Sequence, residues 1–182
     1  MQRSEQAKKN FMSGLNCPQS VFLAFRDLTG LDEKSAMKLS APLGGGVGRM
    51  REICGTVSAM MLVLGCVFYD ADHPTTAEKS ALYALEQELA DRFRQKYGSI
   101  VCRELLKGIV SDASPAAEER TAEYYRKRPC PDMCAEAAAM LEGFLKEKGK
   151  LYFAGKALRI RHCAVRTHCI RRSRRGGAAE CG

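Results

Sequence analysis

The chain is divided into segments whose apolar residues recur at helical spacing, and no segment alternates apolar and polar residues over strand length. The segment that opens at Cys17 places Phe22, Phe25 and Leu28 on one face and ends at Gly30. Residues with high helix propensity, chiefly Ala, Leu, Met, Glu and Lys, dominate the composition. The sequence therefore predicts an all-α fold, a compact bundle of several helices.

Signals for helix starts and stops set the expected boundaries. Asp32 is the expected cap of one helix, and Thr75 with Glu78 forms a capping-box pattern at the start of another. Pro18 and Pro131 stand where proline is favoured, in the first turn of a helix. Helices are expected over residues 4–15, 17–30, 33–39, 50–68, 75–97, 99–110, 116–125 and 130–149.

The longest uncharged stretch runs from Ile53 to Tyr69. It is slightly short for a membrane-spanning helix, and it contains Gly55 and Gly65, which suit close packing between helices. We therefore expect a buried central helix over residues 50–68 and no membrane span.

The positive charge of the chain is concentrated at its end. Of the net charge of +8, residues 156–182 hold +7, because eight Lys or Arg face one acid, Glu180. The first 155 residues are therefore close to neutral, which argues against nucleic-acid binding by the folded part. We expect one helical domain over residues 1–150 and a disordered basic tail over 151–182.

The chain has nine cysteines, and none of them forms a Cys-x-x-Cys pair. The positive end of a helix dipole lowers the pKa of a nearby thiol and favours thiolate, the form that attacks disulfides and binds metals. The N-terminus lacks the apolar core of a signal peptide, so we expect a cytoplasmic protein whose cysteines stay reduced. Four cysteines fall where a predicted helix begins: Cys17, Cys54, Cys102 and Cys130.

The other five cysteines are expected to matter less. Cys66 lies within the apolar run, so we expect it to be buried and Cys66→Ser to cost stability. Cys134 follows Cys130 by one helical turn and lies on the same face, which leaves open a redox pair or two metal ligands. The remaining three are in the basic tail: Cys163, Cys169 and Cys181.

A glycine-rich loop, Gly-Gly-Gly-Val-Gly over residues 44–48, precedes the central helix and cannot form a regular helix itself. The Gly-Lys-Ser/Thr ending of a nucleotide-binding P-loop is missing, which argues against a phosphate-binding role. Backbone N–H groups of such a loop can point inward and bind anions, including the sulfides of an iron–sulfur cluster. The candidate cofactor-binding residues are Gly45, Gly46, Gly48 and Gly55.

Together these features resemble the C-GCAxxG-C-C family of small proteins, which is described as redox-active. The resemblance covers roughly residues 5–148 and leaves the tail unmatched. Thr56 and Ala59 stand where the family pattern Cys-Gly-Ala-x-x-Gly has Ala and Gly. The matching parts are the segment from Phe11 to Val21, the glycine-rich loop with Cys54-Gly55, Cys102, and the segment from Cys130 to Ala138. The family's four cysteines map onto Cys17, Cys54, Cys102 and Cys130.

Four thiolates have the ligand chemistry of an iron–sulfur cluster, which is usually held by four cysteines, or of a tetrahedral zinc ion. Their spacing matches no local ferredoxin or zinc-ribbon motif, so such a centre requires the four helix starts to converge in space. Our first hypothesis is a redox-active protein with a metal or iron–sulfur centre for electron transfer to an unidentified partner protein. Its metal ligands would be Cys17, Cys54, Cys102 and Cys130.

Two alternatives stay open. The first is a thiol–disulfide reductase in which Cys54 is the attacking thiolate and another of the four cysteines, with Cys17 the candidate, resolves the intermediate. The second is a helical interaction module whose thiols are buried for structural reasons only.

Overall fold

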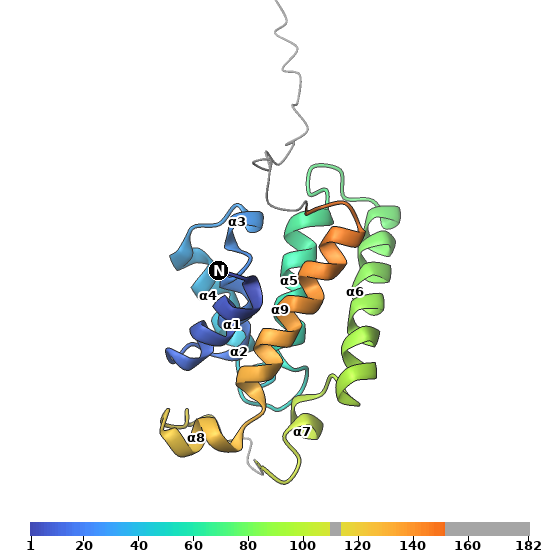
Figure 1. Cartoon of the computed structure of the whole chain (residues 1–182). Coiled ribbons are helices and arrows are strands. Elements are labelled where there is room, and N and C mark those ends of the chain that lie inside the picture. The colour runs from blue at the N-terminus through green and yellow to red at the C-terminus, as the bar shows by residue number, and fades with distance from the viewer. Residues whose placement is uncertain (110–113, 152–182) are drawn as a thin grey trace, which may run out of the picture.

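The computed structural model describes residues 1–109 and 114–151, and its regular elements over these residues are all helical (Figure 1). The predicted fold class is confirmed. The predicted tail falls mainly on residues 152–182, outside the described residues, so its disorder and the domain boundary near residue 150 stay predictions. The helices are α1 (Arg3–Met12), α2 (Cys17–Leu23), α3 (Arg26–Thr29), α4 (Glu33–Ser40), α5 (Gly55–Phe68), α6 (Thr76–Tyr97), α7 (Cys102–Leu105), α8 (Ala122–Lys127) and α9 (Cys130–Glu147), with a 3-10 turn, η1 (Ala41–Leu43), after α4.

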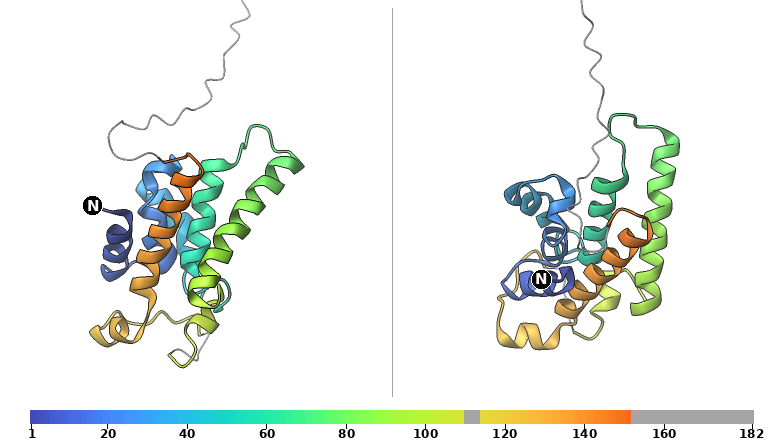
Figure 2. Two further views of the ribbon diagram at one scale, coloured as in Figure 1. Left: turned by 45° about the vertical axis from the view of Figure 1, so that its right-hand side comes forward. Right: turned by 45° about the horizontal axis from the view of Figure 1, so that its top comes forward.

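Helix α5 is the centre of the bundle and packs against α2, α6 and α9 (Figures 1 and 2). The first helix, α1, lies along the last, α9, and this is the most extensive helix pair of the fold. The predicted buried central helix is confirmed, because one side of α5 enters the core through residues such as Met60 and Leu64. Large side chains from the other helices complete this core: Phe11, Phe22, Phe25, Phe93, Leu141 and Phe144.

Caps explain where several helices begin. The Asn16 side chain accepts a hydrogen bond from the N–H of Gln19, whose own side chain accepts one from the N–H of Asn16, so that the start of α2 is closed from both sides. Asp32 caps α4 and Thr75 caps α6, as the sequence predicts.

Several predicted helices are shorter in the structure, and the one predicted over residues 17–30 is divided into α2 and α3. Helix α5 begins at Gly55 instead of residue 50, because Val47, Arg49 and Arg51 have left-handed backbone angles, with φ of 58°, 65° and 61°. Helices α7 and α8 have only four and six residues. The segment over residues 114–121 is non-helical. One of its contacts is from Arg49, whose Nε donates to the Ser114 carbonyl at 2.6 Å.

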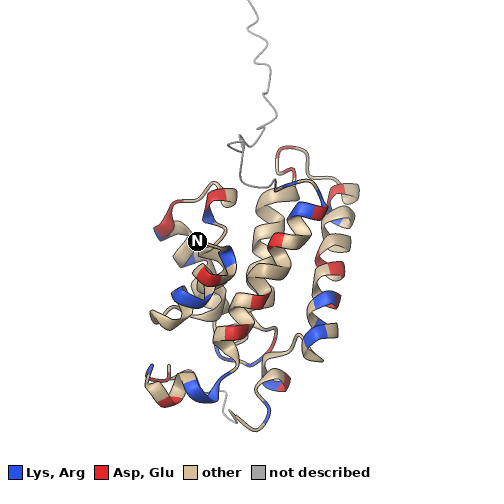
Figure 3. Ribbon diagram, in the orientation of Figure 1, with Lys and Arg blue, Asp and Glu red and all other residues tan. Residues whose placement is uncertain are grey.

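Both signs of charge are spread over the outer faces of the helices (Figure 3). Ion pairs join neighbouring helices, as where Arg92 of α6 contacts Glu88 and also Glu147 of α9, at 2.8 and 2.7 Å. Within the part of the chain that the structure describes, no helix is both long and apolar enough to cross a membrane.

Candidate functional site

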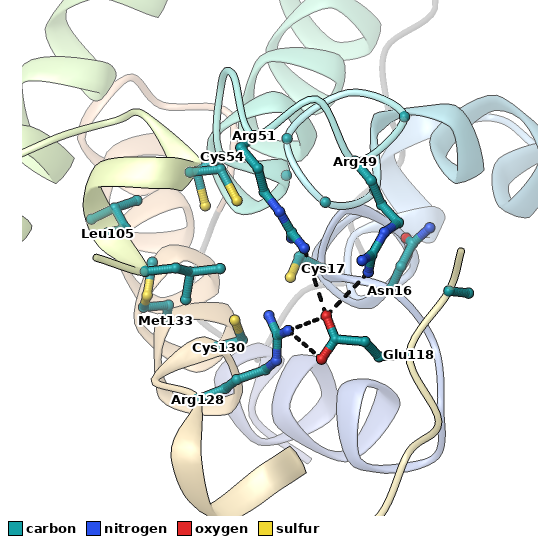
Figure 4. Close-up of a pocket in the computed structure, with 18 of the residues that line it drawn as sticks. Asn16, Cys17, Arg49, Arg51, Cys54, Leu105, Glu118, Arg128, Cys130 and Met133 are labelled. Atoms are coloured by element: carbon teal, nitrogen blue, oxygen red, sulfur yellow. Dashed lines mark hydrogen bonds and ion pairs between the residues drawn. The ribbon is translucent and has the colours of Figure 1, made fainter. Parts of the chain in front are cut away.

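Four helix starts meet around a cavity of about 320 Å³ (Figure 4). Cys17, Cys102 and Cys130 are the first residues of α2, α7 and α9, and Cys54 is the cap residue of α5. The helix positions expected for these cysteines are therefore confirmed. All four line the cavity, although they lie far apart in the sequence.

Two of the cysteines are brought together by a short antiparallel contact between residues 51–54 and 100–103. The N–H of Cys54 donates to the Ile100 carbonyl at 2.8 Å, and the N–H of Cys102 donates to the Glu52 carbonyl at 2.6 Å. An isolated β-bridge lies between these two hydrogen bonds. The start of α5 is thus held beside the start of α7.

Two glycines allow the other close approaches. A Cβ added at Gly46 would lie 2.6 Å from the Cβ of Cys102. A Cβ added at Gly55 would lie 2.5 Å from the Cδ of Pro18 and 3.2 Å from the Cβ of Cys17. Because real Cβ atoms do not come this close, glycine is needed at both positions for the cysteines to converge.

The glycine-rich loop closes on itself. The six N–H groups of residues 47–52 already donate to backbone carbonyls of residues 42–47, so the prediction that the loop amides form an inward-facing nest is wrong for these six. The role of Gly45, Gly46, Gly48 and Gly55 in binding a cofactor stays a prediction. The N–H groups of residues 47–52 donate to the carbonyls of Leu43, Pro42, Gly44, Val47, Gly45 and Gly46, in that order.

Three thiols form a connected cluster. The thiol of Cys17 lies close enough to the thiols of Cys130 and Cys134 to change their pKa values, as they change its own. The Cys134 thiol also donates to the backbone carbonyl of Cys17, at 3.9 Å between sulfur and oxygen. Sequence analysis gave Cys134 less weight than the other four, although its spacing from Cys130 placed both on one helical face.

Burial and the interactions between the thiols, rather than the helix dipole, determine the direction of the thiol pKa shifts. Burial raises the pKa of Cys102 and of Cys134. The hydrogen bond from Cys17, together with burial, raises the pKa of Cys130 well above its usual value. For Cys17, the hydrogen bond with Cys130 lowers the pKa, but the bond with Cys134 and burial outweigh it, so the net pKa is well above its usual value. The predicted lowering of these pKa values is wrong.

Cys54 is the clearest case. Its side chain is 4% exposed, and burial raises its pKa from 9.0 to about 11. Thr56, which stands where the family pattern has Ala, places its hydroxyl oxygen 3.2 Å from the Cys54 sulfur and partly offsets this rise in pKa. At neutral pH the Cys54 thiol is protonated.

Stability is expected to fall in alkaline solution because of this group. Above pH 9 the Cys54 thiol of the unfolded chain ionises while the buried thiol stays protonated up to about pH 11. The stabilisation from the neutral thiol is therefore complete below pH 9 and declines between pH 9 and 11, by about 3 kcal/mol. Urea denaturation between pH 9 and 11 measures this loss of stability. The free energy of unfolding of Cys54→Ala is expected to decline less steeply with pH than that of the unchanged protein. Equal declines in the two proteins would contradict this assignment.

Beside the thiols lies a set of guanidinium groups that we call the arginine cradle: Arg49, Arg51 and Arg128. Arg51 and Arg128 are only 6% and 8% exposed. All three contact the carboxylate of Glu118 (Figure 4), with Arg128 at 2.5 and 2.7 Å, Arg49 at 3.2 Å and Arg51 at 3.6 Å. Burial acts to raise the pKa of Glu118, but the guanidinium groups of Arg128 and Arg49 outweigh it and hold the pKa below its usual value.

The cradle also acts on the thiols. Arg51 lines the same cavity as Cys102 and lowers the pKa of its thiol, and Arg128 does the same for Cys130. Both effects favour thiolate, against the larger effect of burial. Cations and thiols therefore form one connected site.

A fourth arginine, Arg120, lines the cavity and stacks on aromatic rings. Its guanidinium carbon lies 4.7 Å from the ring centre of Phe11 and 4.5 Å from that of Tyr124. Its Nη2 donates to the Leu15 carbonyl at 3.3 Å. Sequence analysis missed the four arginines and Glu118, although Arg49 and Arg51 lie in the glycine-rich motif and Arg128 lies two residues before Cys130.

Cys66 lies away from this site and is exposed, so the predicted burial of its side chain is wrong. It occupies a face of α5 that the neighbouring helices leave uncovered. The expected stability cost of Cys66→Ser therefore loses its basis, since a serine hydroxyl there would be in contact with water.

The donor chemistry of the site suits a metal centre, but its arrangement does not. Cysteine thiolates are the usual ligands of iron–sulfur clusters and of structural zinc. Yet among residues 1–109 and 114–151, no group of three or more His, Cys, Asp or Glu side chains is placed to hold a metal ion.

Comparisons with known proteins agree with the cysteine pattern. Neither the curated proteins nor the solved structures include a match to the chain. A family model described as "Putative redox-active protein (C_GCAxxG_C_C)" matches residues 15–144, which include the thiol cluster, the glycine-rich loop and the arginine cradle. The chain therefore belongs to the C_GCAxxG_C_C family.

Proposed function

We propose that the protein carries out thiol–disulfide exchange and that Cys17 and Cys130 cycle between dithiol and disulfide. The observation that carries this proposal is the clustering of Cys17 with Cys130, which lines the same cavity, and with Cys134, whose thiol contacts the Cys17 carbonyl. Thiols clustered in this way need little movement to form a disulfide. The family's redox-active description supports the same chemistry.

Cys17 is the better candidate for the attacking thiol than Cys54. Cys17 is partly exposed, whereas Cys54, Cys102, Cys130 and Cys134 are buried. An attacking thiol must reach its substrate, which the partly exposed Cys17 can do; the pKa values of Cys17 and Cys54 are both raised, so exposure is what distinguishes the two. This assignment keeps Cys17 as a catalytic residue and gives Cys54 a supporting position in the wall of the cavity.

The proposed reaction is a two-electron exchange in two steps. The Cys17 thiolate attacks one sulfur of a substrate disulfide, which forms a mixed disulfide and releases the other substrate sulfur as a thiol after protonation. The Cys130 thiolate then attacks the Cys17 sulfur, which forms the Cys17–Cys130 disulfide and releases the second substrate thiol. Two protons and two electrons pass from the protein to the substrate. Arg128 supports the second step, because it lowers the pKa of the Cys130 thiol.

Disulfide mapping on the unchanged protein tests the proposal. After mild oxidation with diamide and digestion under acidic conditions, mass spectrometry is expected to find Cys17 linked to Cys130, with some linkage to Cys134. A protein whose Cys17 stays reduced while other thiols become oxidised would contradict the proposal. Reduction with dithiothreitol should then restore the free thiols of all the cysteines that diamide had oxidised.

Electron transfer by an iron–sulfur or other metal centre is the second candidate function. What favours it is that four cysteines, the usual ligand number of such clusters, line one cavity. The placement of the donors in the described residues speaks against it. Anaerobic purification followed by iron, sulfide and zinc analysis separates the two functions, because stoichiometric metal would favour the second and a metal-free protein with a mapped disulfide the first.

Thiol–disulfide exchange also needs a compartment and a source of electrons. We propose that the protein works in the cytoplasm, where thiols are kept reduced, and that a partner protein reduces its disulfide. Cys130→Ser removes the thiol that releases the substrate and is therefore expected to keep a disulfide substrate bound to Cys17 as a mixed disulfide.

A further inference from the structure

The cavity beside the thiols is lined by four arginines and one acidic residue of the described chain, Glu118. Arg49, Arg51 and Arg128 enter from the glycine-rich loop and from the segment before α9 (Figure 4), and all three reach the same carboxylate. Arginine binds carboxylates and other oxyanions with paired, planar hydrogen bonds, as Arg128 does here. The cradle is therefore a formed site for an anionic oxygen group.

The arginines of the cradle are held more firmly by the fold than Glu118, the residue whose carboxylate they bind. Arg51 and Arg128 are almost fully buried, and the loop that carries Arg51 is fixed by its own hydrogen bonds. The Glu118 side chain is 39% exposed and belongs to the non-helical segment over residues 114–121. A carboxylate from solution can therefore reach the position that Glu118 occupies without rearranging the helices.

A second polar group of the cavity points to a ligand independently. The Nη1 atom of Arg120 is buried and has no hydrogen-bond acceptor among the described residues. Its guanidinium faces are covered by Phe11 and Tyr124, so the rings hold it in place without supplying an acceptor. Buried donors without a partner are rare in folded proteins, and this one lies in the same cavity wall as the cradle.

We propose that this cavity binds a small molecule with carboxylate groups and that Glu118 holds the anion position until a carboxylate of the ligand replaces it. Because Arg128 lines the cavity with Cys130, and Cys130 clusters with Cys17, a ligand held by the cradle lies beside the reactive pair. The substrate is therefore a small anionic disulfide. The identity of the substrate rests on the proposed thiol–disulfide exchange, whereas the anion site does not.

Binding without redox chemistry tests the anion site. The probe is 3,3′-dithiodipropionate, a disulfide with two carboxylates, titrated into the Cys17→Ser protein by calorimetry. We expect Glu118→Gln to tighten binding about tenfold, because it removes the internal competitor, and Arg128→Gln to weaken it about tenfold. Arg94→Gln, which changes an exposed arginine of α6, should leave binding unchanged. Unchanged or weaker binding in Glu118→Gln would overturn the proposal.

Two further variants guard against a folding defect, because Arg128 is buried. Arg49→Gln removes a more exposed member of the cradle and is also expected to weaken binding of 3,3′-dithiodipropionate. Arg128→Lys keeps the positive charge and is expected to retain part of the binding affinity for 3,3′-dithiodipropionate. Loss of binding in Arg94→Gln equal to that in Arg49→Gln would show a general charge effect and contradict a built site.

Reaction with the unchanged protein tests the choice of substrate. Cystamine is a disulfide of similar size with two ammonium groups in place of the carboxylates. We expect 3,3′-dithiodipropionate to oxidise Cys17 at least about tenfold faster than cystamine at equal concentration. Equal rates would overturn the anionic substrate while leaving thiol exchange intact. Tight binding of the carboxylate probe with no oxidation of Cys17 would instead overturn the proposed exchange while leaving the anion site intact.

Discussion

Replacing Gly55 with alanine is expected to lower the free energy of unfolding by about 3 kcal/mol or more. The new Cβ would lie 2.5 Å from the Cδ of Pro18 and 3.2 Å from the Leu43 carbonyl oxygen. Neither neighbour can turn away, because one belongs to a ring in the first turn of α2 and the other to the backbone. The starts of α2 and α5 would have to separate, and with them Cys17 and Cys54. Urea denaturation measures the loss of stability.

Gly65 is the matched control for this substitution, since it lies in the same helix. A Cβ added there would meet no atom within 4 Å. Gly65→Ala is therefore expected to leave stability unchanged or to raise it by up to about 1 kcal/mol, through better helix propensity. Similar losses for the two variants would mean that α5 tolerates no side chain at either glycine, and the close approach at Gly55 would not be the cause.

Cys17→Ser is expected to reduce the rate of disulfide exchange at least about 100-fold, because a serine hydroxyl does not attack disulfides at neutral pH. The fold should survive, since the side chain is partly exposed and the substitution changes one atom. Single-turnover reduction of 3,3′-dithiodipropionate, followed by counting the released thiols, measures this rate.

Cys66→Ser serves as the control for this loss of activity. Cys66 is an exposed thiol on α5, so its removal should change the rate by less than about twofold. Activity that survives in Cys17→Ser but disappears in Cys54→Ser would identify Cys54, rather than Cys17, as the attacking thiol. Activity lost equally in Cys17→Ser and Cys66→Ser would argue against a defined reactive pair.

Much of the fold can be predicted because its boundaries are local. Asp32, Thr75 and Pro131 mark helix starts through contacts within one turn of the chain, and the structure confirms all three. Residues 116–121 are non-helical although a helix is predicted over 116–125, because the conformation of this segment depends on distant partners. Arg49 holds the Ser114 carbonyl and Arg128 holds Glu118, and no local pattern reveals such pairs.

The candidate site divides in the same way. Its cysteines are predictable in position because helix starts are local features, and Cys134 follows from its helical spacing to Cys130. The acidity of the thiols cannot be predicted from local sequence. Burial of Cys54 is a property of the assembled bundle, and its effect on the pKa outweighs that of the helix dipole. The arginine cradle was missed for a related reason, because it is recognised only through Glu118, which approaches from a separate segment.

The pairing of α1 with α9 has a consequence for the order in which the protein assembles. A chain emerging from the ribosome completes its early helices first, and α1 can then pack on α2, but its most extensive contact forms only after α9 has been synthesised. The cluster of Cys17 with Cys130 and Cys134 likewise cannot form before α9 is made, because the last two cysteines belong to α9. The long sequence separation of these contacts predicts slower folding than in a bundle of sequential helix hairpins. During synthesis the unpaired cysteines are open to outside oxidants, and a chain cut before α9 would lose core packing and reactive thiols together.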